Sequence, residues 1–361
     1  MIEAVVAGHI CLDIIPEMHG EVTFTPGKLI EAGAATISTG GAVSNTGITL
    51  TKLGVATKLI GRIGNDPFGR IVKEILEGHQ AGLGQAMSVC EGAGTSYTLV
   101  VNLSGHDRMF IHAPGCNDLF DSYDLPEEEL KGARLFHFGY PPLMAKMFAN
   151  EGRELEKIFA RAKEAGLITS LDTSLPDPNA PSGKADWRKI LERVLPHVDI
   201  FLPSSDELGY MLGMPSEGVE DCRAMATVAL QLGAKIVGIK AGGSGFYLRT
   251  SEGLGWFSKD WEERELWSPC FKVEVAGTTG SGDATIGGFL MALLRGLGPF
   301  ESVTAATAVG ACCCEAPDSV SGVQSWSATQ TRVQANWTRL PMNLGRAWAL
   351  TKEGVFERTQ P

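Results

Sequence analysis

The sequence has 361 residues, 44% of them hydrophobic, which is enough to fill the core of one large domain or two modest ones. Its formal charge is -11 at pH 7 and no basic patch offsets it, so nucleic acid and anionic membranes are disfavoured as partners. The N-terminal residues lack the basic region and the small-residue cleavage site typical of a secretory leader, and no apolar run approaches the roughly 20 residues of a membrane span. We therefore expect a cytoplasmic protein.

Short apolar runs recur along the chain and alternate with helix-periodic segments. The runs lie at residues 4–8, 57–61, 134–139, 167–172, 198–203 and 235–240. Helical patterns between them include residues 151–166 and 221–233. This alternation predicts an α/β fold with a mostly parallel sheet.

Two stretches interrupt the alternation with β-branched and aromatic residues. They span residues 14–37 and 91–113, and the second contains a central Ser-Gly pair typical of a hairpin turn. Because they are separated in sequence, we expect them to meet as a small β lid over one edge of the main sheet. The prediction is a single domain over residues 1–361 with this lid inserted in it.

The eight cysteines form no CxxC pair, and no nearby histidines complete a zinc site, so we expect reduced thiols. Three of them are consecutive at residues 312–314. Adjacent side chains on a helix point in different directions, which favours small core residues over a site for a soft metal.

A glycine-rich turn at residues 276–282 leads directly into an amphipathic helical segment. The apolar residues behind it fall at helical spacing and form one face: Ile286, Phe289, Leu290, Leu293, Leu294 and Leu297. Gly280, Ser281 and Gly282 therefore stand at a helix N-terminus, where backbone N–H groups and the positive end of the dipole can bind an anion.

Asp283 follows this turn, and its position allows two interpretations. A first-turn carboxylate stabilises the helix dipole, which is a common structural role. A carboxylate beside a phosphate-binding turn can also act as a general base that takes a proton from a hydroxyl. The turn is not a Walker A loop, because no Gly-Lys-Ser/Thr closes it, and its spacing does not fit a dinucleotide-binding fingerprint.

A second glycine-rich motif lies within residues 38–76. Gly40 and Gly41 open a predicted helix there, and Asn45 stands one turn into it. Asparagine is disfavoured inside a helix, so a polar contact with a ligand is a reasonable alternative to a surface position.

Together, these two stretches resemble the two signature motifs of the ribokinase-like, or PfkB, family of carbohydrate and nucleoside kinases. Other segments resemble family segments in the family's order along nearly the whole chain: residues 8–13, 104–118, 202–213 and 239–248. The resemblance implies a Rossmann-like, doubly wound α/β fold with a β lid over the acceptor site. It also implies that the reaction is phosphoryl transfer from ATP.

For Asp283, the resemblance implies the role of catalytic base. It would accept the proton of the acceptor hydroxyl as that oxygen attacks the γ-phosphoryl of ATP. The N–H groups of Gly280, Ser281 and Gly282 would stabilise the developing charge.

The resemblance also implies a set of substrate ligands. Asp13 matches the family position that hydrogen-bonds sugar hydroxyls, Gly41 leaves room for the sugar, and Asn45 binds it through its amide. Asn117 is a weaker candidate. Arg108 either reaches the acceptor from the lid or is a solvated hairpin residue.

On the nucleotide side, Lys240, Gly242 and Gly245 match the strand-to-turn segment beside ATP. Glu207 matches the acid of the family's Asn-x-x-Glu motif, which acts on Mg²⁺ through water, and Ser204 takes the place of its asparagine. Ser204 keeps a hydroxyl that can hold a water, so we expect weakened rather than absent metal organisation.

A further departure from the family lies beside the catalytic turn, where Gly277 replaces the aspartate that often precedes Thr-Thr-Gly. The loss of this side chain puts in doubt the monovalent-cation site of some family members, and we assign no potassium ion. Lid edges in this fold often pair between subunits, which makes a homodimer plausible.

The leading hypothesis is an ATP-dependent, Mg²⁺-requiring kinase that phosphorylates a hydroxymethyl group of a sugar or sugar derivative. A nucleoside kinase of the same fold is one alternative, with Met109, Phe110 and Tyr140 as possible walls for a base, although core packing explains these residues equally well. A catalytically silent sugar or nucleotide sensor is another, since the departures lie near the metal and cation sites. The retained Asp283 turn argues against the sensor.

Overall fold

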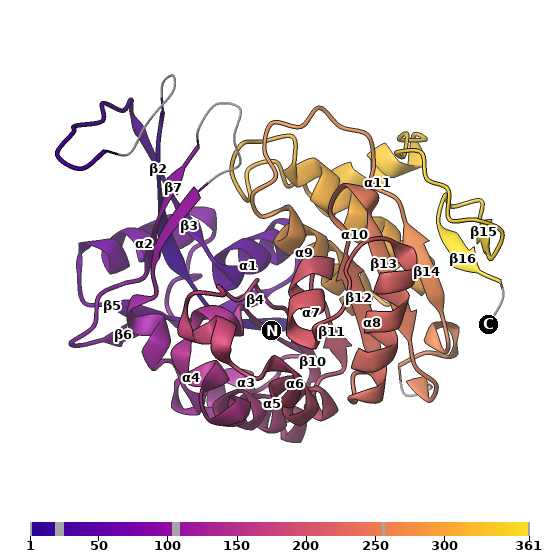
Figure 1. Cartoon of the computed structure of the whole chain (residues 1–361), viewed down its shortest axis with the longest axis horizontal. Helices are drawn as coiled ribbons and strands as arrows, with labels where there is room; N and C mark the ends of the chain where they lie inside the picture. Colours follow the sequence, from indigo (N-terminus) through magenta and orange to yellow (C-terminus); the bar gives the residue numbers. More distant parts are fainter. Residues whose placement is uncertain (1, 19–24, 103–108, 255–256, 360–361) are drawn as a thin grey trace.

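The computed structural model describes residues 2–18, 25–102, 109–254 and 257–359 (Figure 1). Ten strands of the described residues form one sheet, in the order β15-β16-β14-β13-β12-β11-β10-β9-β1-β4. Their bounds in that order are Trp348–Leu350, Phe356–Arg358, Glu265–Ser268, Phe246–Thr250, Ile236–Lys240, Ile200–Phe201, Ile168–Leu171, Leu135–Gly139, Ala4–Gly8 and Thr57–Ile60.

The strands from β4 to β12 run parallel, whereas β13, β14, β16 and β15 continue the sheet antiparallel. Each of the six predicted apolar runs contains one of the parallel strands, because a parallel strand covered on both faces needs a continuous apolar sequence. The predicted α/β fold with a mostly parallel sheet is thus confirmed. Parallel strands end at the same edge, so the loops after them gather there.

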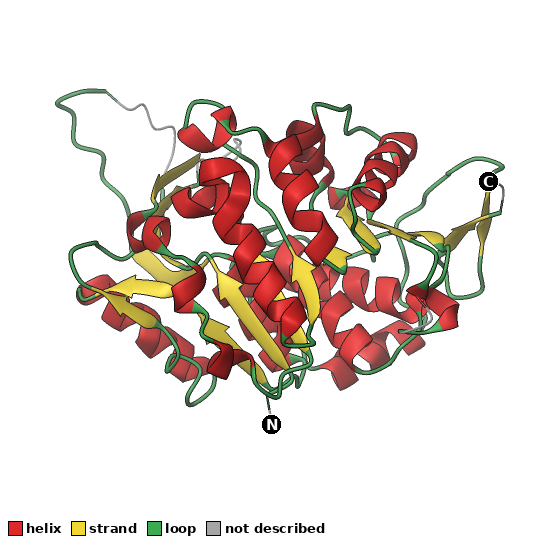
Figure 2. Ribbon diagram, turned by 90° about the horizontal axis from the view of Figure 1, so that it is seen from below, coloured by secondary structure: helices red, strands yellow, loops and turns green. Residues whose placement is uncertain are grey.

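Helices cover both faces of the sheet (Figure 2). Those named here are α1 (Ala42–Lys52), α2 (Pro67–His79), α3 (Glu127–Leu130), α4 (Ala145–Phe148), α5 (Arg153–Glu164), α6 (Trp187–Val194), α7 (Ser205–Leu212), α8 (Val219–Gln231), α9 (Ser281–Leu294), α10 (Pro299–Cys313) and α11 (Trp326–Gln334). Alternate residues of β1 serve opposite cores: Ala4 and Val6 pack with α1, α9 and α10, whereas Val5 and Ala7 pack with α4 to α8.

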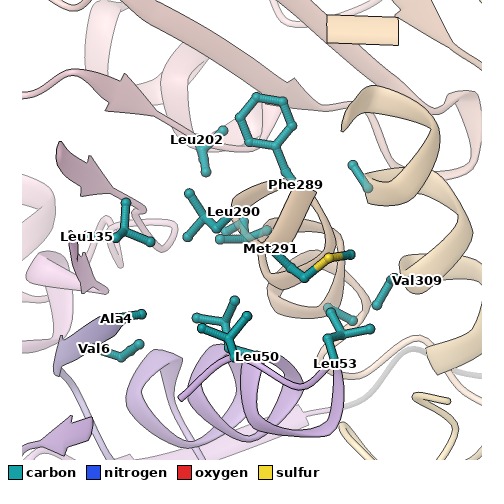
Figure 3. Packing of buried hydrophobic residues seen from close by; sticks show 14 of the residues in the cluster. Ala4, Val6, Leu50, Leu53, Leu135, Leu202, Phe289, Leu290, Met291 and Val309 are labelled. Atoms are coloured by element: carbon teal, nitrogen blue, oxygen red, sulfur yellow. The ribbon is translucent and has the colours of Figure 1, made fainter. Parts of the chain in front are cut away.

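Helix α9 lies between α1 and α10, with Phe289, Leu290 and Met291 directed into the core (Figure 3). The approach of α1 is close because Gly287 lacks a side chain: a Cβ there would stand 2.4 Å from Thr49 Cγ2. This packing brings the first turn of α1 beside the first turn of α9, so two segments more than 230 residues apart in sequence share one site.

A smaller sheet protrudes from the main body (Figure 1). Its strands are β3 (Ala35–Gly40), β2 (Cys11–Pro16), β7 (Tyr97–Val101) and β8 (Met109–Ala113), in that order. Strands β7 and β8 lie within the predicted stretch 91–113 and form an antiparallel pair, whereas β2 and β3 include only the two ends of the predicted stretch 14–37 and extend outside it to Cys11 and Gly40. The Ser-Gly turn and Arg108 lie outside the described residues. Strands β5 (Arg62–Gly64) and β6 (Ser88–Cys90) pair separately.

The eight cysteines are all free, and Cys312 and Cys313 are buried in the core as their small size predicts. In the parts of the chain that the structure describes, no helix combines the length and the apolar character needed to cross a bilayer.

Candidate active site

A cavity of about 700 Å³ lies under the smaller sheet, at the edge where the parallel strands end. Its lining comes from the smaller sheet, from the first turns of α1 and α9, and from the loop after β10. The residues used below are His9, Asp13, Gly41, Asn45, Phe110, His112, Tyr140, Ser174, Glu207, Gly280 and Asp283. We call it the acceptor cavity.

Asp283 stands in the first turn of α9 and is buried at the base of this cavity. Its Oδ2 accepts hydrogen bonds from Asn45 Nδ2 at 3.0 Å and from the Tyr140 hydroxyl at 2.8 Å, and its Oδ1 accepts one from Thr46 Oγ1 at 3.2 Å. Burial raises the pKa of Asp283, while Lys240 and these three hydrogen bonds oppose the rise. The carboxylate is thus fixed in place and made more basic than an exposed aspartate.

The Tyr140 hydroxyl is a donor to this carboxylate, because burial and the neighbouring Asp283 charge raise the pKa of the phenol. Replacing Tyr140 by Phe removes that hydrogen bond and should raise the pKa of Asp283 further. We expect the acidic limb of the pH profile of kcat/KM to move to higher pH by about one unit, the size of one hydrogen bond to a charged group. An acidic limb that stays in place would show that Tyr140 does not tune this carboxylate.

A smaller cavity of about 270 Å³ adjoins the first one. Ser204, Lys240, Gly242 and Gly282 line it, and it shares Tyr140, Glu207, Gly280 and Asp283 with the acceptor cavity. Asp283 therefore lies where the two cavities meet, which is the geometry that a transfer between two bound molecules requires.

Lys240, at the end of β12, joins a buried charge cluster below this junction. Its Nζ lies 2.5 Å from Asp172 Oδ1 and 3.9 Å from Glu207 Oε2. Burial alone would lower the pKa of the lysine, but Asp172 and Glu207 outweigh it and raise that pKa to about 12. Burial raises the pKa of Asp172 against the opposing effect of Lys240. Since a Cβ on Gly282 would stand 3.5 Å from Lys240 Cδ, the lysine also lies against the turn before Asp283.

A match to the pfkB family carbohydrate kinase model extends over residues 1–326. The chain belongs to this family. It is a carbohydrate kinase and hence a phosphotransferase. It is 29% identical over 290 residues to fructokinase-1 of Zea mays, covering 80% of this chain and 82% of that protein, and equally so to fructokinase-1 of Oryza sativa subsp. japonica.

Solved structures share the fold. The ribokinase of Arabidopsis thaliana complexed with ribose and ATP matches with a TM-score of 0.72 at 22% identity, covering 92% of this chain and 98% of that one. The fructokinase of Xylella fastidiosa with bound ATP also matches with a TM-score of 0.72, at 19% identity, and the match covers 93% and 99% of the two chains. The predicted ribokinase-like fold is confirmed.

The structure of this PfkB-family chain changes the interpretation of two predicted residues, Asn117 and Ser281. Asn117 is buried and does not line the acceptor cavity: its Nδ2 donates to Ile10 O at 2.8 Å and its Oδ1 accepts from Ile10 N at 3.4 Å. Its amide is used to hold the backbone, which corrects the predicted substrate contact. Ser281 donates both its N–H and its hydroxyl to Thr278 O, at 3.3 and 2.9 Å, so the predicted trio of N–H groups is reduced to Gly280 and Gly282.

Three glycines of the family motifs have a positive φ, and the space around each shows what it serves. Gly245 has a φ of 121° and a Cβ there would lie 2.2 Å from Ser268 O, so it serves the turn and lines neither cavity. Gly41 has a φ of 86° and a Cβ there would lie 2.5 Å from His9 Nδ1. Gly41 therefore leaves room for His9 rather than for the sugar, although it still lines the acceptor cavity. Gly242, with a φ of 52°, remains open toward the smaller cavity.

Glu207 and Ser204 form the capping box of α7. Glu207 Oε2 accepts from Ser204 N at 2.7 Å and from Thr173 Oγ1 at 2.9 Å, and Ser204 Oγ accepts from Glu207 N at 3.3 Å. This structural role accounts for the Ser-x-x-Glu spacing. Glu207 still lines both cavities, so it remains the acid available near a nucleotide.

Asp13 lies on β2 and faces the acceptor cavity, where burial raises its pKa to about 6. Between pH 4 and 6 the folded carboxyl holds a proton that the unfolded chain has lost, so the stability of the fold falls as the pH rises through this window. Asp13→Asn removes this titration. We expect the unfolding free energy of the natural chain to fall by about 2 kcal/mol more than that of Asp13→Asn between pH 4.5 and pH 7. Urea unfolding of both proteins at the two pH values tests this, and parallel pH dependences would contradict it.

Two residues of the site, Thr46 and Asp172, were not predicted, because each follows an ordinary helix or strand pattern in the sequence. Tyr140 was considered only as a wall for a nucleoside base, and its hydrogen bond to Asp283 was not predicted. Asp172 is the last residue of the predicted apolar run 167–172, and the end of a parallel strand lies at the ligand-binding edge of the sheet, so this position could have indicated a site residue.

Proposed function

We propose that this carbohydrate kinase transfers the γ-phosphoryl group of ATP to a hydroxymethyl group of a sugar, with Asp283 as general base. The observation that carries the proposal is the position of Asp283 at the junction of the two cavities, in the first turn of a helix that points its N-terminus at them. The acceptor belongs in the larger cavity and the ATP phosphates in the smaller one.

The reaction needs three things from the chain. Asp283 takes the proton of the acceptor hydroxyl while that oxygen forms a bond to the γ-phosphorus and the bond to the ADP oxygen breaks. The N–H groups at Gly280 and Gly282 and the helix dipole stabilise the charge on the transferring group. The Lys240 ammonium, held against Gly282, supplies a fixed positive charge on the same side.

Mg²⁺ fits this arrangement through water. In the described residues, no three histidine, cysteine or acidic side chains are grouped to hold a metal ion directly. Mg²⁺ usually keeps several waters and binds through one or two carboxylates plus substrate phosphates, a role open to Glu207. When bound with ATP, it neutralises phosphate charge.

We also propose that the protein works in the cytoplasm as a homodimer. Eight free cysteines suit a reducing compartment. On β8, the edge strand of the smaller sheet, Met109, Phe110 and Ile111 are exposed, which suits pairing with a second copy. Light scattering on the purified protein distinguishes a dimer from a monomer.

The function is tested by ADP release from Mg-ATP with a panel of hexoses, pentoses, keto-deoxy acids and nucleosides. We expect turnover with a sugar. Phe110 and Tyr140 line the acceptor cavity, so a nucleoside base has possible walls, and faster turnover with nucleosides would move the assignment to that class. Ligand-induced stabilisation without any ADP release would indicate a sensor.

A further inference from the structure

Buried polar atoms without a hydrogen-bond partner gather around the acceptor cavity. Among the described residues, five such atoms belong to four side chains that line it. They are both ring nitrogens of His9, His112 Nε2, Asn45 Oδ1 and Ser174 Oγ. Because buried polar groups are nearly always paired in a native protein, this group of atoms points to a ligand that pairs them.

The two histidines form the centre of this group. His9 follows β1 and is only 2% exposed, and its ring lies 5.1 Å from that of His112 on β8. His112 Nδ1 is 3.0 Å from Thr98 Oγ1, which leaves Nε2 for a ligand. The His9 ring also stacks on Tyr140 at 6.2 Å, and Tyr140 contacts the catalytic Asp283. The histidines therefore stand beside the reacting end of the cavity.

Hydroxyl groups of a ligand can satisfy the hydrogen-bonding needs of the unpartnered atoms. Burial lowers the pKa of both imidazoles, so each ring is neutral and offers one donor and one acceptor. Asn45 Oδ1 and the Asp13 carboxylate accept only. A hydroxyl can donate and accept, so several hydroxyls satisfy this set together, whereas a carboxylate or phosphate can only accept.

The negative charge of the cavity lining also favours a neutral acceptor. The acidic residues that line it are Asp13, Asp177, Glu207, Asp283 and Asp318. The lining includes no lysine or arginine within the described residues. A negative group on the acceptor would meet carboxylates of like charge, while the Lys240 ammonium beside Glu207 is paired with Asp172 and lines the smaller cavity instead.

We propose that His9 and His112 are specificity residues that bind hydroxyl groups of a neutral, polyhydroxylated acceptor, and that the cavity rejects acceptors bearing a carboxylate or phosphate. This inference rests on the proposed kinase function and goes beyond it by naming the acceptor class and two residues that select it.

The first test compares matched acceptors on the full-length enzyme with Mg-ATP. Each neutral sugar is paired with anionic relatives that keep a free hydroxymethyl group, for example glucose with gluconate and glucose 1-phosphate, and fructose with fructose 1-phosphate and fructose 6-phosphate. We expect the best neutral acceptor to exceed every anionic one in kcat/KM by about 100-fold or more, since a like-charge contact costs several kcal/mol. An anionic acceptor that equals or surpasses the neutral ones overturns the proposal.

The second test replaces each histidine by phenylalanine, which keeps an aromatic ring and removes the nitrogens. We expect His9→Phe and His112→Phe to raise the KM of the neutral acceptor about tenfold, with a smaller change in kcat and no change in the KM of ATP. His9→Asn restores a donor and an acceptor and should recover part of the loss. Unchanged acceptor KM values in both phenylalanine variants overturn the assignment.

His137→Phe is the matched control, because His137 is equally buried and has an unpartnered Nε2, but does not line the acceptor cavity. Its acceptor KM should stay at the value of the natural chain. If a variant folds poorly, calorimetry on the natural chain compares the affinities of the paired neutral and anionic acceptors. This comparison tests the charge preference without any variant. Absence of ADP release with every acceptor would contradict the proposed kinase function. Turnover that favours anionic over neutral acceptors would contradict only this inference.

Discussion

Replacing Asp283 by Asn should lower kcat by a factor of about 10² to 10⁴ while the acceptor and ATP still bind. The variant keeps the size of the side chain but cannot take the proton of the acceptor hydroxyl. Because burial raises the pKa of Asp283, removing the charge should leave the unfolding free energy equal or higher. Steady-state kinetics and urea unfolding measure the two effects separately.

Asp177→Asn is the matched control for this variant. Asp177 lines the same cavity, but its Oδ1 accepts from Asn179 N at 2.9 Å, a bond that asparagine can keep. Its kcat should stay within about threefold of the natural value, as for a surface substitution away from the reacting atoms. Equal losses in both variants would show that the charge of the cavity matters and not a base at position 283.

Replacing Lys240 by Met should cost about 3–5 kcal/mol of unfolding free energy, the cost of removing one partner from a buried ion pair. Asp172 is fully buried and Lys240 is 12% exposed, so water cannot replace the lost partner. Without the ammonium, the pKa of Asp172 rises further, and the loss should be greater at pH 8 than at pH 5, where protonation removes its charge.

The double variant Lys240→Met with Asp172→Leu separates stability from function. It should recover most of the unfolding free energy, because the carboxylate of Asp172 is no longer buried without its partner. The KM of ATP should be raised in both the single and the double variant, since both lack the positive charge against Gly282. A single Lys240→Met variant as stable as the natural chain would contradict the role of this ion pair.

The sequence contained enough information to predict the α/β fold, because the parallel strands are covered on both faces and need continuous apolar runs. The antiparallel strands β13 to β16 were not predicted. They are short and form one side of the sheet, where an alternating or mixed sequence is sufficient. Residues beyond 326, which the family match does not reach, provide β15 and β16.

The site was predictable only where one local motif determines it. Asp283 follows a glycine-rich turn and stands in the first turn of the helix behind it, so its position was predictable from the local sequence. Tyr140 and Asp172 reach the same cluster through the order of the strands, which local patterns do not reveal. Asn117 was wrongly predicted to contact the substrate. An asparagine that binds a sugar and one that binds the backbone of Ile10 cannot be distinguished in a sequence.

Identification of the product tests the central claim most directly. The purified chain is incubated with Mg-ATP and the acceptor that releases ADP fastest, and phosphorus NMR follows both products. We predict one phosphate ester on the hydroxymethyl oxygen for each ADP formed, and loss of both products in Asp283→Asn. Release of inorganic phosphate without a sugar ester, or an ester formed equally well by Asp283→Asn, would contradict the account.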